Sequence, residues 1–298
     1  MQDANLPILE RIQRRVLWLA TWMVHHANNL RPNPDGTKVG GHQASSASSV
    51  SLLTALYFHH LRHGDVVALK AHAAPAFYAI QYLLGRLTAD DLRELRTFGR
   101  LQAYPSRRKN PEIVHLSTGS MGLGAVQATF GAFAARYLAD HGAPGGPERF
   151  IVMVGDAELD VGNVWEALLE EPLAALGTVR WIVDMNRQSL DRVVPDSRRR
   201  QLRDMFAAAG WRVIECRWGH RLGSVLRAPG GDTLARRLEA MPNAGYHALL
   251  RLPGGAGDPR LPLPRRGQAK ERVVHRVRHG LKPPRQGVAA RSAQDRAE

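Results

Sequence analysis

A wholly apolar run of five residues, Phe150-Ile-Val-Met-Val154, is followed directly by Gly155 and Asp156. An uninterrupted apolar run of this length is typical of a strand buried on both faces of a parallel sheet. Further strand-like segments lie at residues 66–69, 179–183 and 211–216. Helical patterns separate these strands. The alternation predicts an α/β fold, a doubly wound, mostly parallel sheet flanked by helices and joined by right-handed crossovers.

The composition is that of a globular protein. Of 298 residues, 44% are hydrophobic and 23% are charged, which excludes a wholly disordered or fibrous chain. The single cysteine, Cys216, has no partner for an intrachain disulfide, and this favours a reducing, cytoplasmic setting. No run approaches the ~20 apolar residues that span a bilayer. Residues 1–5 lack the basic start of a secretion signal, so we expect neither a membrane segment nor a leader.

The net charge of +14 is unevenly distributed along the chain. Residues 260–298 hold 11 Lys and Arg against 3 Asp and Glu. We therefore expect an N-terminal helix and lead-in over residues 1–37, one ligand-binding domain over 38–251, and a disordered Pro/Gly/Arg-rich tail over 252–298. Binding of nucleic acid or another anionic surface by the tail is an alternative. Nucleic acid is not the expected partner, because no basic stripe with interleaved aromatic residues accompanies the charge.

Polar side chains follow two of the predicted strands. Asp156 comes directly after the strand at 150–154, and Asn186 and Gln188 follow the next strand along the chain. Because ligands bind at the carboxyl ends of parallel strands, we expect these groups to converge. One carboxylate, one amide and the backbone carbonyl of Gln188 suit a Mg²⁺ site completed by a diphosphate. The alternative is a helix cap at Asp156 and ordinary turn residues at the other two positions.

The segment Gly155-Asp-Ala-Glu-Leu-Asp160, followed by Asn186-Arg-Gln188, resembles the thiamine diphosphate signature of the transketolase and pyruvate dehydrogenase group. The closer resemblance is to the homodimeric bacterial pyruvate dehydrogenase, carried by Gly85–Leu92, Ser120–Gly124, Asn186–Asp191 and Ala209–Ile214. The resemblance implies thiamine diphosphate and Mg²⁺ as cofactors, a 2-oxo acid such as pyruvate as substrate, and residues 38–251 as the diphosphate-binding domain. Its metal ligands would be Asp156, Asn186 and Gln188, and its cofactor contacts would include Gly155, Ala157, Glu158 and Asn186.

Four further residues carry over from the resemblance. His42 and His72 match the two family histidines near the diphosphate and the reaction centre, where an imidazole donates to phosphate or transfers protons. Ser120 and Met121 stand at the predicted start of a helix, where backbone amides favour phosphate. Met121 matches the apolar contact that holds the cofactor bent. The alternatives are solvated loop histidines and a core methionine.

The chain departs from the family pattern at three places. Ala157 replaces the second glycine of the signature, and His72 lies among alanines where the family has glycines. Beyond residue 250 no second α/β pattern follows. We therefore expect the pyrimidine-binding domain, whose glutamate activates the cofactor, to come from a partner chain or a homo-oligomer. A transketolase-like ketol-transfer subunit and a non-catalytic truncated relic are the alternative functions.

Overall fold

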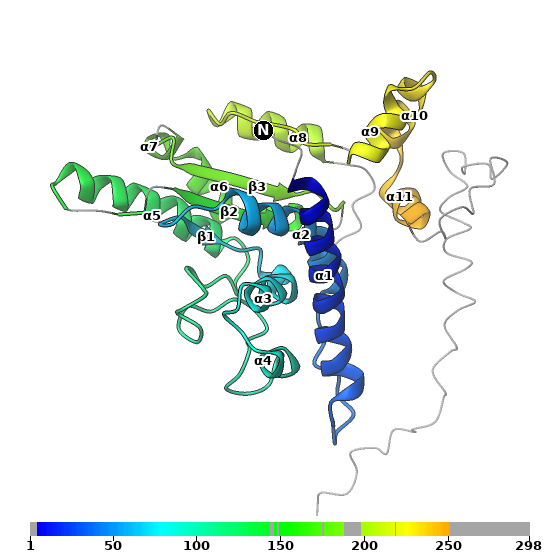
Figure 1. Ribbon diagram of the computed structural model, residues 1–298. Coiled ribbons are helices and arrows are strands. Elements are labelled where there is room, and N and C mark those ends of the chain that lie inside the picture. Colours follow the sequence, from blue (N-terminus) through cyan, green and yellow to red (C-terminus); the bar gives the residue numbers. More distant parts are fainter. Residues whose placement is uncertain are drawn as a thin grey trace, which may run out of the picture. The chain divides into compact units, whose positions relative to one another are not determined.

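The computed structural model describes residues 5–143, 146–147, 149–174, 176–187, 198–217 and 219–250. The chain divides into two units, Met1–Val225 and Leu226–Glu298. The first unit contains three parallel strands, β1 (Val66–Ala68), β2 (Phe150–Gly155) and β3 (Val179–Asp184), hydrogen-bonded in that order (Figure 1). The predicted α/β fold with a parallel sheet is confirmed. The predicted domain boundaries stay predictions, and the tail at 252–298 lies outside the described residues.

Helices precede, separate and follow the strands of the first unit. They are α1 (Leu6–His25), α2 (Gln43–Ala55), α3 (Ala74–Leu83), α4 (Ala89–Arg93), α5 (Leu123–Asp140), α6 (Gly162–Leu169), α7 (Glu171–Ala174) and α8 (Arg199–Ala208). The short π-helices η2 (His26–Leu30) and η3 (Leu56–His60) extend α1 and α2, and the 3₁₀ turns η4 (Ala71–Ala73) and η5 (Asp156–Asp160) follow β1 and β2. Helix α9 (His220–Arg227) spans the unit boundary, and α10 (Gly231–Ala240) and α11 (Asn243–Leu250) lie in the second unit.

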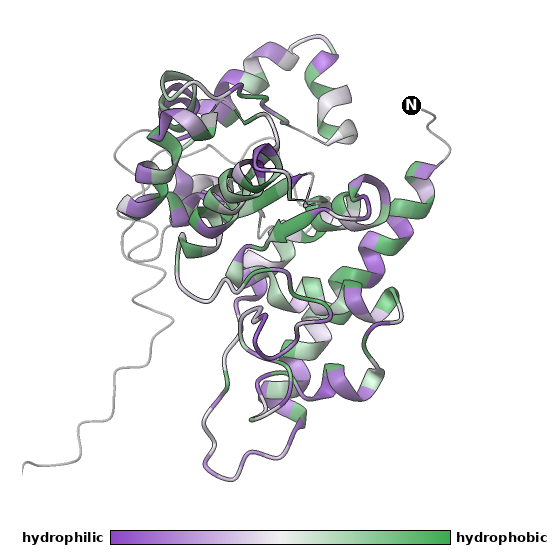
Figure 2. Ribbon diagram, turned by 90° about the vertical axis from the view of Figure 1, so that its left-hand side faces the viewer, coloured by the Kyte–Doolittle hydropathy of each residue, from purple (hydrophilic) through white to green (hydrophobic). Residues whose placement is uncertain are grey.

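Helices cover both faces of the sheet because successive strand residues point to opposite sides. Ile151 and Met153 of β2 belong to a core cluster that includes buried residues of α1, α2 and α3. Val152 and Val154 belong to a second cluster with α5, α6 and α8. The doubly wound arrangement is thereby confirmed. Figure 2 shows the hydrophobic strands, in green, among helices that carry purple residues on other sides.

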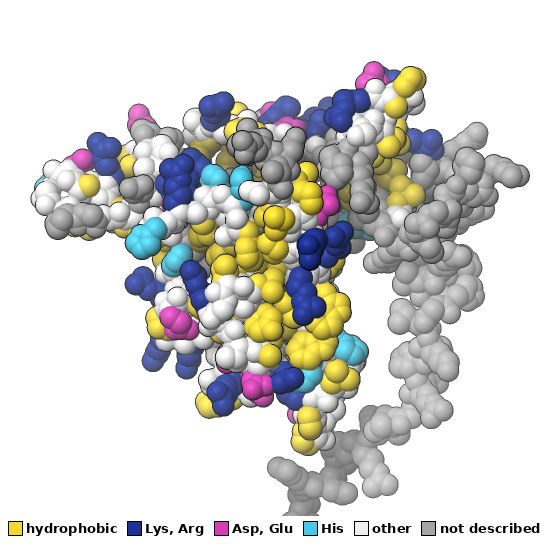
Figure 3. All heavy atoms as spheres, in the orientation of Figure 1, with side chains coloured by type: hydrophobic (Ala, Val, Ile, Leu, Met, Phe, Trp, Pro, Cys, Tyr) yellow, Lys and Arg dark blue, Asp and Glu magenta, His cyan; other side chains and the backbone are white. Residues whose placement is uncertain are grey.

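Helix α1 is amphipathic and lies within the segment where an N-terminal helix was expected. Its inner stripe buries Val16, Leu19 and Met23, whereas Leu17 and Trp18 are 41% and 54% exposed. Figure 3 shows apolar side chains, in yellow, along the face that α1 presents in that view. Within the described ranges, none of the helices combines the length and the apolarity that crossing a membrane requires.

The predicted strand at 211–216 is wrong. This segment has no regular secondary structure, and Val213 and Ile214 are 38% and 72% exposed. Side chains rather than strand pairing anchor the segment. The Trp211 indole Nε1 donates to the Leu168 carbonyl at 3.0 Å, and its ring lies edge-on to Trp181. The Glu215 carboxylate pairs with Arg199 of α8. A strand needs a neighbouring backbone to pair with, and among the described residues β3 pairs only with β2. The apolar residues alone do not supply that partner.

Candidate functional site

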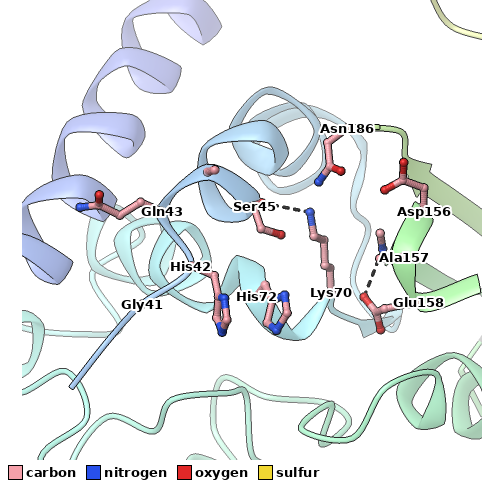
Figure 4. Close-up of a pocket in the computed structure, with 12 residues that line it drawn as sticks. Gly41, His42, Gln43, Ser45, Lys70, His72, Asp156, Ala157, Glu158 and Asn186 are labelled. Atoms are coloured by element: carbon pink, nitrogen blue, oxygen red, sulfur yellow. Dashed lines mark hydrogen bonds between the residues drawn. The ribbon is translucent and has the colours of Figure 1, made fainter. Parts of the chain in front are cut away.

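The carboxyl ends of the three strands border a cavity of about 340 Å³. Seven of the predicted site residues line it: His42, His72, Gly155, Asp156, Ala157, Glu158 and Asn186 (Figure 4). They come from four parts of the chain: the loop before α2, the turn after β1, the end of β2 and the end of β3. The expected convergence at the sheet edge is therefore present in the structure.

Asp156 stands at the first position after β2, and its two carboxylate oxygens have different surroundings. Oδ2 accepts a hydrogen bond of 2.9 Å from the backbone N–H of Arg187. Oδ1 is buried and has no hydrogen-bond partner among the described residues. A buried carboxylate oxygen without a partner costs free energy unless something else satisfies it. The geometry of Asp156 therefore leaves one oxygen for a cation.

Arg187 holds a backbone conformation that is uncommon for a residue with a side chain. Its φ is 61°, in the left-handed region. Such residues cluster where a loop is fixed for function. This conformation places the Arg187 amide against Asp156, directly after Asn186, so the loops that follow β2 and β3 are tied together at the cavity.

The pKa of Asp156 is raised to about 6, first by burial and then by the neighbouring Asp184 carboxylate. The Arg187 amide and the Lys70 ammonium act in the opposite direction. The net effect means that this site carries an energetically unfavourable negative charge near neutral pH. A bound cation would relieve it.

Glu158 uses its carboxylate to organise the backbone of the turn. Its Oε1 accepts from the Gly155 N–H at 3.1 Å, the dashed line near Ala157 in Figure 4, and burial raises its pKa. The backbone of Gly122 also hydrogen-bonds to it. Ala157 fits this turn without strain, because Arg96 and Arg187 are the only described residues other than glycine with positive φ.

His42 and His72 form a stacked pair at the other side of the cavity. Their ring centroids lie 3.7 Å apart, and the ring of Tyr104 lies 5.8 Å from that of His72. Burial, followed by the charge of His42, lowers the pKa of His72 to about 4. Burial and then Arg96 lower the pKa of His42. Both imidazoles are therefore neutral near pH 7 and can accept or donate a proton.

Two of the predicted residues, Ser120 and Met121, are not brought into this cavity. Ser120 is exposed and Met121 is half-buried just before α5, and neither is among the described residues that line the cavity. The predicted helix does begin there, at Leu123. Gln188 lies outside the described residues, so its predicted role as a metal ligand stays a prediction.

The same site contains a buried ion pair that was not predicted from the sequence. Lys70, directly after the strand run that ends at Leu69, lines the cavity, and its Nζ lies 2.7 Å from Oδ2 of Asp184, the last residue of β3. The rule that located Asp156, a polar residue at the carboxyl end of a predicted strand, applies equally to both. Tyr104, beside the histidines, gave no comparable signal in the sequence.

Residues 59–233 match the family described as the thiamine diphosphate binding domain of transketolase. The matched segment covers more than half of the chain and includes the ends of all three strands. The chain belongs to this family. As a thiamine diphosphate-binding domain of the transketolase type, it is also 31% identical over 264 residues to the pyruvate dehydrogenase E1 component of Mycobacterium tuberculosis, and 30% identical over 249 residues to that of Escherichia coli K12.

These relatives are much longer than the matched part. The alignments cover 83% and 80% of this chain but only 28% and 27% of the two E1 components. The transketolase from Leishmania mexicana has a similar fold, with a TM-score of 0.58 and 24% identity, covering 70% of this chain and 32% of that structure. The transketolase of Campylobacter jejuni gives 0.57. The thiamine diphosphate-binding fold of the chain is thus confirmed, and it corresponds to part of such an enzyme.

Proposed function

We propose that this domain binds the diphosphate of thiamine diphosphate together with Mg²⁺ in the cavity at the sheet edge, as part of an enzyme that decarboxylates a 2-oxo acid. The observation that carries the proposal is the buried Oδ1 of Asp156, which has no protein partner in the described part of the chain. Figure 4 shows the Asp156 carboxylate pointing toward Asn186 across the cavity. The E1 relatives support the reaction class.

The residues present fit a Mg²⁺ ion. One carboxylate and the amide of Asn186 are oxygen donors of the kind that Mg²⁺ takes, with diphosphate and water oxygens completing the set. The described residues contain no cluster of three or more His, Cys, Asp or Glu side chains suited to a metal. That composition agrees with Mg²⁺, which uses one or two carboxylates, and disfavours zinc. Gln188 is proposed to add its backbone carbonyl.

The protein's own residues would bind and orient the cofactor. Thiamine diphosphate supplies the carbanion chemistry when it is bound. Asp156 and Asn186 would hold the diphosphate through the metal, and Gly155, which has no Cβ, would let the phosphate approach the backbone of the turn that Ala157 continues. The neutral, stacked side chains of His42 and His72 line the same cavity and would contact the phosphate or transfer a proton. Ser120 and Met121 are proposed as further cofactor contacts.

The binding proposal is tested by calorimetry on the purified chain with Mg²⁺ and thiamine diphosphate. We expect saturable binding for the wild-type protein and at least a roughly tenfold loss for Asp156→Ala, the order of effect of removing a charged ligand. Asp90→Ala, at an exposed carboxylate on α4, is the control and should bind like wild type. Equal binding by Asp156→Ala would remove the metal assignment, and no binding by the wild-type protein would favour a non-catalytic relic.

We further propose that a pyrimidine-binding domain, on a partner chain or within a homo-oligomer, completes the active site. The alignments cover about a quarter of each E1 relative, and the rest of each relative lies outside the aligned part. The test is a pull-down followed by a decarboxylation assay with pyruvate, in parallel with a ketol-transfer assay using a ketose phosphate. Pyruvate turnover that requires the captured partner supports the proposal, whereas ketol transfer alone would favour the transketolase-like alternative. The cytoplasmic setting stays a prediction.

A further inference from the structure

Lys70 is a buried cation in the cavity that the proposed metal site does not use. The residue is 2% exposed, and its side chain lies across the carboxyl end of β2. A Cβ atom added to Gly155 would lie 3.3 Å from Cε and 3.8 Å from Nζ of Lys70. Beyond Gly155 the ammonium reaches Asp184 at the end of β3. Lys70 therefore spans all three strands directly under the turn that carries Asp156.

The Lys70 ammonium makes two strong hydrogen bonds and one weak one. Nζ donates to Asp184 Oδ2 at 2.7 Å and to the Ser45 carbonyl at 3.0 Å. The third contact, to Ser48 Oγ, is 3.4 Å long, beyond the usual range for a hydrogen bond from nitrogen to oxygen. Figure 4 shows the side chain extending between Ser45 and the Asp156 turn. The third N–H can therefore turn to a ligand in the cavity while the two strong contacts persist.

The positive charge of Lys70 acts on the cavity as well as on Asp184. Its partner Asp184 also accepts hydrogen bonds from Ser48 Oγ at 2.6 Å and Ser49 Oγ at 3.3 Å, so the carboxylate is shared among three donors. The charge of Lys70 also acts on other groups of the site: it contributes to the lowered pKa of His72 and opposes the burial that raises the pKa of Asp156 and Glu158. A desolvated ammonium that faces a cavity favours an anion there.

A purely structural ion pair is the simpler reading of these contacts. Lys70 and Asp184 join the outer strands across β2, and a tie of this kind needs no ligand. A purely structural ion pair could lie anywhere across the sheet. Lys70 instead lines the cavity beside Gly155, where a ligand would meet it. The two readings differ in one measurable property, the affinity of the cavity for an anion when no metal is present.

We propose that Lys70 binds the diphosphate directly and gives this cavity an affinity for diphosphate that does not depend on Mg²⁺. The inference rests on the proposed function, because the cavity is the same. In this proposal the residues have two different roles. Asp156 and Asn186 would contact the diphosphate through the metal, and Lys70 would contact it directly as a charged hydrogen-bond donor.

The experiment is calorimetric titration of the full chain with inorganic pyrophosphate, once in excess Mg²⁺ and once in EDTA. We expect wild-type protein to bind in EDTA and Lys70→Met to lose that binding by roughly 10- to 100-fold, the range for one hydrogen bond to a charged group. Lys70→Arg should keep most of it, because it keeps the charge. Asp156→Asn should keep the binding in EDTA and lose the gain that Mg²⁺ gives.

Lys70→Met leaves Asp184 buried without its cation and can fail to fold for that reason alone. The double variant Lys70→Met/Asp184→Asn removes both charges and should melt close to the wild-type temperature. If this folded double variant binds pyrophosphate in EDTA like wild type, or if wild type binds only with Mg²⁺, the inference is overturned. Failure of the proposed function is distinguishable: thiamine diphosphate with Mg²⁺ would not bind, while metal-free pyrophosphate binding would still depend on Lys70.

Discussion

The imidazole rings of His42 and His72 stack at 3.7 Å between centroids, although the residues lie thirty positions apart in the chain. His42 is the residue before α2, and His72 lies in the short turn after β1. Two protonated imidazoles at this distance would repel each other. The stacking therefore favours a state in which at least one ring is neutral. A neutral imidazole can both donate and accept a proton beside a diphosphate site.

We expect His72 to titrate near pH 4 in the wild-type protein, because burial and then the charge of His42 lower its pKa. In His42→Gln the pKa of His72 should move back towards 6.5, since one like charge is removed. Between pH 6.5 and about 4 the unfolded chain binds a proton that the folded chain does not, so stability falls as the pH falls through this window. NMR titration of the ring resonances measures both values. A wild-type pKa near 6.5 for His72 would contradict the stacked arrangement.

Asp156→Asn should stabilise the unliganded protein while it removes metal-dependent binding. The raised pKa of about 6 means that ionised Asp156 opposes folding near neutral pH, chiefly because it is buried. The neutral amide keeps an acceptor for the Arg187 N–H, and we expect a gain of about 1–3 kcal/mol at pH 7. The sign follows from linkage: the gain is absent below pH 3.8 and full above about pH 6.

The measurement for Asp156→Asn is urea unfolding at several pH values. Asp90→Asn serves as the control, because that carboxylate is 85% exposed and its pairing with Arg93 is an exposed contact. Its effect should stay within about 0.5 kcal/mol. A destabilised Asp156→Asn variant would show that the carboxylate is stabilised within the unliganded fold, and the argument for a cation there would lose its basis.

Arg149 and Asp65 form a buried pair that joins the residue before β2 to the residue before β1. The side chains are 12% and 3% exposed, and Arg149 Nε donates to Asp65 Oδ1 at 2.7 Å. Burial alone would raise the pKa of Asp65, but the Arg149 and Arg62 hydrogen bonds lower it overall. Arg149→Met should therefore lower the free energy of unfolding by about 3–5 kcal/mol, because it leaves the buried Asp65 carboxylate without its cation.

Arg136→Met is the matched control for Arg149→Met. Arg136 pairs with Asp140 one turn along α5, but both side chains are more than half exposed. Loss of that pair should cost about 0.3–0.5 kcal/mol. Because the pKa of Asp65 is lowered, its stabilising contribution is present above its ordinary pKa and is lost as the pH falls through the lowered value. Thermal or urea unfolding measures the loss of stability in each variant. Equal losses would refute the claim that the buried pair contributes more to stability than the exposed pair.

The sequence was sufficient to predict the features that depend on local patterns. The apolar run of β2 is long enough to specify a strand buried on both faces, and the structure has all six residues of β2 buried. The metal candidates were found because Asp156 and Asn186 each follow a strand. Each of these patterns extends over only a few consecutive residues. They can therefore be recognised in one sequence without knowledge of the fold.

The features that the sequence did not reveal depend on partners far along the chain. Lys70 and Asp184 are separated by 114 positions, and neither residue type alone indicates an ion pair under the cavity. The segment after Trp211 has apolar residues but no paired strand beside it in the described structure, so its strand propensity is overridden. Which groups meet in space was the missing information in both cases.

Gly122, the residue before α5, should tolerate no side chain. It has φ of 73°, and an added Cβ would lie 2.6 Å from Asn163 Oδ1 and 2.7 Å from Val161 Cγ2. Gly99 is a matched control, because its φ is also 73° and nothing lies within 4 Å of the added atom. Gly99→Ala isolates the backbone strain of about 1–2 kcal/mol, and Gly122→Ala adds an overpacking cost of about 1–3 kcal/mol.

Gly122→Ala should also weaken cofactor binding, because the Gly122 backbone hydrogen-bonds to Glu158, whose carboxylate holds the Gly155 turn. Unfolding measurements give the stability difference between the two variants, and calorimetry with Mg²⁺ and thiamine diphosphate gives the binding. A Gly122→Ala protein that is no less stable than Gly99→Ala would mean that α5 shifts freely away from α6. If it then also binds like wild type, the contact between Gly122 and Glu158 does not position the turn, and the proposed link between the start of α5 and the diphosphate site would be lost.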